Sequence, residues 1–132
     1  MTTGLVTVSS LHRFPETLER LTQAIGQGGA EIFARIDHAA NAQAAGLALR
    51  PTTVLVFGAG KAGTPLMQAE QSLGLDLPLR ALVYEDARGR VWVAYNCPDW
   101  IAERHGLDPG AFPPVAGMTT FLETVVARAT GA

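Results

Sequence analysis

Five segments of the chain have the pattern and length of β-strands. Residues 5–8 and 31–36 alternate between apolar and polar positions, so Ile32, Ala34 and Ile36 are predicted to share one face. Residues 79–84 and 91–95 flank a connection that contains Gly89, which predicts a β-hairpin. Residues 53–57 (TVLVF) are nearly all apolar. This run predicts a central strand covered on both faces.

Helical spacing separates these strands. The segment from Phe14 to Ile25 repeats apolar residues every three or four positions, and Gly28 ends it. Asp37 is expected to cap a short helix over residues 38–45. Further helices are predicted over about 64–73, 98–105 and 114–130. Strands and helices in this order predict one compact two-layer α+β domain, residues 1–132, whose five-stranded mixed or antiparallel sheet has helices packed on it.

Charge and cysteine content narrow the class of protein. Ten basic and twelve acidic residues give a formal net charge of -2, which lacks the basic footprint that nucleic-acid binding needs. Apolar runs all fall short of the roughly 20 residues of a membrane helix, so no membrane partner is expected. Cys97 is the single cysteine, and the first residues do not have the pattern of a secretory signal. These features together predict a cytoplasmic protein.

A glycine-rich turn, Gly58-Ala-Gly-Lys-Ala-Gly63, follows the apolar strand. Its G-x-G-x-x-G spacing matches a dinucleotide-binding turn, but the next two strands form a hairpin rather than the crossovers of a doubly wound sheet. The turn of NTPases requires Ser or Thr after the lysine, where this chain has Ala62. Two interpretations remain: an anion site at Lys61 and Thr64 beside a helix start, or a tight turn with a solvated lysine.

Polar residues at other strand–helix junctions are candidate site residues. His38 beside Asp37 could act as a general base, or the pair could form a cap and a first-turn residue. Asn41 lies one helical turn from His38. Cys97 at a helix start could form a thiolate or be a buried, inert residue. The three histidines are too far apart in sequence for a zinc motif, so no metal site is predicted.

Several motifs, in the same order, resemble the family catalogued as domain of unknown function 302. They are residues 33–41 (FARIDHAAN), 49–52 (LRPT), 61–67 (KAGTPLM), 76–79 (DLPL), Tyr95-Asn96 with Pro98, and Arg104-His105. The resemblance covers a core of about residues 5–107, followed by a C-terminal helix at about 114–130. It implies a compact α+β domain from bacteria or archaea that is often a homodimer, without a settled activity.

The chain departs from the family pattern in two places. Ala59-Gly60 replaces the usual Asn-Pro, so the G-x-G-x-x-G spacing is interpreted as a product of that change. Cys97 stands where the family often has an acidic or other polar residue. The polar motif residues near strand–helix junctions, where a pocket is expected, are Asp37, His38, Asn41, Lys61, Thr64 and Asn96.

These observations leave four functional hypotheses. The first is a homodimer that binds a small anionic ligand or a cofactor of unknown identity in a pocket formed by the His38 and Lys61 junctions. The second is an enzyme acting on a small metabolite, with His38 as the general base. The third is a haem protein with His38 or His105 as the axial ligand. The fourth is a module that binds a protein partner and takes no ligand.

Overall fold

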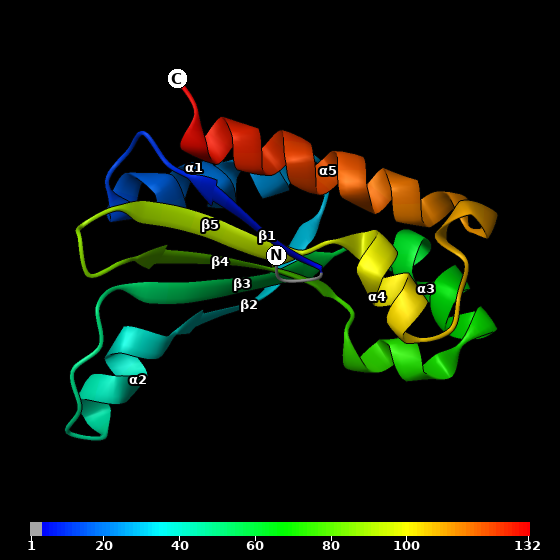
Figure 1. The fold of residues 1–132 in the computed structure, drawn as a ribbon, viewed down its shortest axis with the longest axis horizontal. Helices are drawn as coiled ribbons and strands as arrows, with labels where there is room; N and C mark the ends of the chain where they lie inside the picture. The colour runs from blue at the N-terminus through cyan, green and yellow to red at the C-terminus, as the bar shows by residue number, and fades with distance from the viewer. Residues whose placement is uncertain (1–3) are drawn as a thin grey trace.

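The computed structural model describes residues 4–132 and has the predicted α+β architecture (Figure 1). Its five strands form one open antiparallel sheet in the order β1-β5-β4-β3-β2. The strands are β1 (Leu5–Ser9), β2 (Glu31–Asp37), β3 (Thr52–Gly58), β4 (Leu79–Glu85) and β5 (Val91–Asn96). The α-helices are α1 (Phe14–Gln27), α2 (His38–Ala44), α3 (Gly60–Ala69), α4 (Pro98–Arg104) and α5 (Pro113–Thr130), with 3-10 helices η1 (Gln71–Leu75) and η2 (Pro109–Ala111).

The helices α1 and α5 pack against each other and along one side of the sheet (Figure 1). Side chains on that side of the three middle strands are buried, including Leu55, Val83 and Val93, each 0% exposed. They meet Leu21 of α1 and Leu122 of α5, which are also fully buried. The hydrophobic core therefore lies between one face of the sheet and these two helices.

The opposite face of β3 is only partly covered. Thr53, Leu55 and Phe57 are buried, whereas the alternate residues of the strand, such as Val54 and Val56, are partly exposed. The prediction that residues 53–57 are covered on both faces is therefore wrong. A continuous apolar run cannot by itself distinguish a strand between two layers from a strand at an open apolar surface.

A bulge changes the pairing of β2 with β3. Ile32 pairs with Phe57, and Ala34 pairs with Val56, so the register shifts by one residue at Phe33. Because alternate residues of a strand point to opposite faces, the extra residue places Ile32 on the core side and Ala34 and Ile36 on the other. The predicted shared face of Ile32, Ala34 and Ile36 is corrected accordingly.

The remaining difference concerns the glycine-rich turn. Helix α3 begins at Gly60 rather than near Thr64, and it ends at Ala69 before the separate 3-10 turn η1. Gly60 and Gly63 therefore belong to the first turn of the helix. Pro65 lies in the second turn, where it has no N–H to donate to the Lys61 carbonyl. The cap at Asp37 is confirmed, since its Oδ1 accepts a hydrogen bond from the Ala40 amide at 2.9 Å.

Candidate functional site

A cavity of about 370 Å³ opens at the end of the sheet where β3 leads into α3. Helix α5 contributes one face to its lining through residues spaced three or four apart, Pro114, Gly117, Met118 and Phe121. The other walls come from the α1–β2 turn, the bulge of β2, the start of α3 and the segment before β4. These walls comprise Gly28, Gly29, Ala30, Phe33, Phe57, Gly58, Ala59, Ala62, Gly63, Met67, Leu77, Pro78 and Leu79.

The cavity lining is apolar and rich in glycine. Every side chain that reaches it belongs to Ala, Leu, Met, Phe or Pro, so an ionised group bound inside would lose its hydration without gaining a polar or charged side-chain partner. At Gly117 an added Cβ would meet no atom within 4 Å, which means that this glycine leaves open space. The arrangement suits a molecule with an apolar body.

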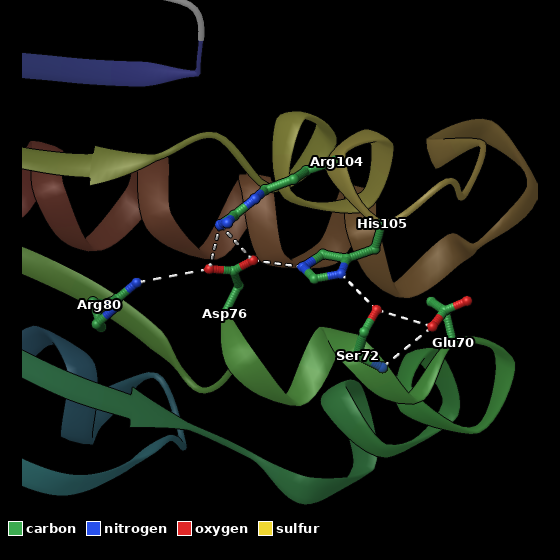
Figure 2. Close-up of polar contacts among 6 residues, drawn as sticks. All are labelled: Glu70, Ser72, Asp76, Arg80, Arg104 and His105. Atoms are coloured by element: carbon green, nitrogen blue, oxygen red, sulfur yellow. Dashed lines mark hydrogen bonds and ion pairs between the residues drawn. The ribbon is translucent and has the colours of Figure 1, made fainter.

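A network of charged and polar side chains joins η1 and the residue after it to the end of α4 (Figure 2). At its centre is Asp76, which is 7% exposed and immediately precedes the wall residues Leu77 and Pro78. Both of its carboxylate oxygens accept hydrogen bonds from Arg104 Nη1 at 3.0 Å. Its Oδ2 is also 2.5 Å from His105 Nε2, and Arg80 Nη2 lies 4.0 Å from Oδ1.

The network continues from His105 to η1. Ser72 Oγ lies 2.8 Å from His105 Nδ1 and 2.9 Å from Glu70 Oε2. The Ser72 hydroxyl, and then the Ser72 amide, donate to this carboxylate and hold the pKa of Glu70 below its ordinary value. Both ring nitrogens of His105 are thus engaged, so neither is available to a haem iron in this arrangement.

The order Ser72–His105–Asp76 has the residue types of a nucleophilic triad. In such a triad the serine proton must pass to the histidine, but here the same hydroxyl also faces the Glu70 carboxylate, and it has a single proton. Ser72 is also absent from the cavity lining. The geometry therefore supports a structural role, in which the network fixes η1 and the Leu77–Pro78 wall to α4.

The predicted site residues separate into two groups. Lys61 and Thr64 lie exposed on α3 close to the cavity wall, and Asn96 ends β5 at the same end of the sheet. Asp37, His38 and Asn41 are exposed at the other end, where β2 leads into α2 and β3 begins. Within one chain, these two groups do not line a common pocket.

Sequence reasoning missed the residues that build the cavity and its support. Asp76 and Arg104-His105 did occur among the motifs shared with the family, and this was the signal available for them. Their contact spans 28 and 29 residues of sequence, so no local spacing indicates it. The cavity lining offered no signal at all, since alanine, glycine and phenylalanine are ordinary core residues.

Comparison with known proteins places the chain in a family. The model of "Domain of unknown function DUF302" matches residues 6–125. The chain belongs to the DUF302 family. A crystal structure of an uncharacterised conserved DUF302 protein from Bacillus stearothermophilus has the same fold, with a TM-score of 0.85 at 20% identity, over 97% of this chain and 99% of that one.

Longer relatives of this DUF302 chain carry a functional name. The proteins named fluoride-specific ion channel FluC 1 from Brucella suis and FluC 2 from Brucella melitensis are each 44% identical to it over 128 residues. The match covers 97% of this chain but 50% and 47% of those proteins. The chain therefore spans about half the length of these relatives. No helix within residues 4–132 combines the length and the apolar composition that crossing a bilayer requires.

The network predicts a large stability difference between two superficially similar substitutions. Asp76→Asn leaves the buried side chain of His105 and the half-exposed Arg104 without their carboxylate, and it should lower the free energy of unfolding by about 2–4 kcal/mol. Glu103→Gln, at an exposed position of α4, should change it by less than about 0.5 kcal/mol. Urea unfolding measures both. A cost for Asp76→Asn no greater than that for Glu103→Gln would contradict the proposed anchoring role.

Proposed function

We propose that this DUF302 chain is a small-molecule binding domain whose ligand has an apolar body and an anionic end. The observation that carries the proposal is the apolar cavity at the end of β3. A cavity of about 150 Å³ can hold benzene, and this one, at about 370 Å³, offers room for two fused rings. Phe33, Phe57 and Phe121 in the lining favour an aromatic ligand, since aromatic rings pack well against one another.

The anionic end of the ligand is proposed to lie at Lys61. This lysine is exposed in the first turn of α3, next to the wall residue Ala62. The amide groups at the start of a helix add positive potential to that of the ammonium group. A charged end can therefore stay hydrated at the rim while the apolar body enters the cavity. The proposal also retains a cytoplasmic location and a homodimer.

A second candidate function follows from the Brucella relatives. We propose that the domain works together with a fluoride channel, as one half of a longer protein or as a separate chain. Its support is the 44% identity to half of each of two proteins named as fluoride-specific channels. Deleting the related half of the Brucella suis protein should then alter fluoride efflux from vesicles. Unchanged efflux and unchanged channel assembly would contradict this role.

Two related dyes test the ligand proposal. N-phenyl-1-naphthylamine is neutral, and 1-anilinonaphthalene-8-sulfonate has a similar ring system with an anionic group. Both should bind with a rise in fluorescence. Gly117→Leu should lower the affinity for both dyes by at least about tenfold because the leucine side chain fills the cavity. The fold should stay intact, since leucine has a higher helix propensity than glycine.

Two charge variants test at which end of the sheet the anionic group of the ligand binds. Lys61→Ala should weaken binding of the sulfonate dye by about 2- to 5-fold, as expected for the loss of one exposed ion pair, and leave binding of the neutral dye unchanged. His38→Ala serves as the matched control and should change neither. If neither dye binds, or if Gly117→Leu leaves both affinities unchanged, the cavity is not the binding site.

A further inference from the structure

The side of the sheet opposite α1 and α5 presents an apolar surface, here called the outer face. Strand pairing aligns Val54 with Leu82, and Leu82 with Ala94, across its middle. Ile36 adjoins Val54 at one side and is 38% exposed, and Leu5 at the far edge is 47% exposed. The outer face comprises Leu5, Thr7, Ser9, Ala34, Ile36, Thr52, Val54, Val56, Arg80, Leu82, Tyr84, Trp92, Ala94 and Asn96.

Charge is nearly absent from the outer face. Arg80 is the one charged residue among those that form it. This arginine lies near the start of β4, and its Nη2 is 4.0 Å from Asp76 Oδ1. The middle of the face carries valine, leucine and alanine, and polar Thr7 and Ser9 follow the edge strand β1. An uncharged apolar centre with a polar margin is the composition of a stable protein–protein interface. Two copies could meet there without placing like charges opposite each other at the centre.

Helix α2 and the segment that follows it project from the same sheet, and residues 38–49 are here called the arm. Figure 1 shows α2 standing apart from the other helices, near the end of the sheet where β3 begins. None of its seven residues is buried. Leu47 and Leu49, which follow it, are 68% and 47% exposed. A helix this short is unstable unless it packs against something, so the arm is suited to contact a second surface.

The area of the outer face indicates that a stable interface would also need the arm. Five strands about 4.8 Å apart, of five to seven residues each, present a face of about 24 Å by 22 Å, or about 500 Å² in projection. A stable interface buries about 800 Å² on each partner. The outer face alone falls short of this area, so an interface built on it needs the exposed residues of the arm as well.

We propose that the outer face and the arm form the interface between two copies of this chain, related by a two-fold axis. Each arm then packs its leucines against the partner, and the two apolar sheet faces exclude water between them. A second copy of the chain can cover the outer face and contact the arm at the same time. In a two-fold interface each arm meets the same surface of the partner. This proposal specifies how the homodimer of the proposed function assembles, and it does not depend on the cavity.

Sedimentation equilibrium measures the assembly directly. The wild-type chain should have twice its chain mass of 13.9 kDa at micromolar concentration. Val54→Lys places a charge at the centre of the outer face and should give the monomer mass. Leu75→Lys is the matched control, since Leu75 is 73% exposed and lies outside the outer face, and it should remain dimeric. Leu47→Ser combined with Leu49→Ser should raise the dimer dissociation constant at least tenfold.

Three controls keep the outcomes distinct. Circular dichroism should show that Val54→Lys remains folded, and Ile36→Glu, at a more exposed position of the same face, replaces it if it does not. Binding of the neutral dye to the monomeric variant tests the cavity independently of the interface. If the wild-type protein is a dimer but binds no dye, only the cavity proposal is refuted. A wild-type monomer up to about 100 µM, or a dimer unaffected by both Val54→Lys and Ile36→Glu, would overturn the interface.

Discussion

The fold depends on the packing of two helices against one face of the sheet. Two long helices, α1 and α5, pack on the same side of five antiparallel strands, so alternate residues of each strand have different surroundings. Leu55 is fully buried while its neighbours Val54 and Val56 are partly exposed. Burying a large aliphatic side chain contributes about 1.5–3 kcal/mol, so the core side drives folding. The apolar residues of the other side remain partly exposed.

The same arrangement produces the cavity. Helix α5 extends past the end of β3, where α3 and the segment before β4 complete the enclosure. Glycines at the contact positions leave space that larger side chains would occupy, as the open surroundings of Gly117 show. The wall at Leu77 and Pro78 is held in place by Asp76, whose carboxylate joins it to α4. The shape of the cavity therefore depends on a packed helix and on one buried ionic contact.

Local patterns in the sequence predicted much of the fold but little of the candidate site. Alternation, turn residues and one continuous apolar run identified all five strands, and Asp37 correctly marked the start of α2. Alternation could not reveal the bulge at Phe33, because an inserted residue leaves the sequence pattern unchanged while it reverses the faces that follow. The contacts of Asp76 with Arg104 and His105 depend on chain segments brought together by folding. Polar junction residues were predicted from motifs, and the structure distributes them over two ends of the sheet.

The most direct test of the cavity as a binding site is to titrate ¹⁵N-labelled protein with N-phenyl-1-naphthylamine and map the amide shift changes by NMR. If the dye binds in the cavity, the largest changes occur at Phe33, Gly58, Gly63 and Gly117, which surround it, and the changes at Val54 and Leu82 are small. Largest changes at Val54 and Leu82, or no saturable change at any amide, would contradict binding in the cavity.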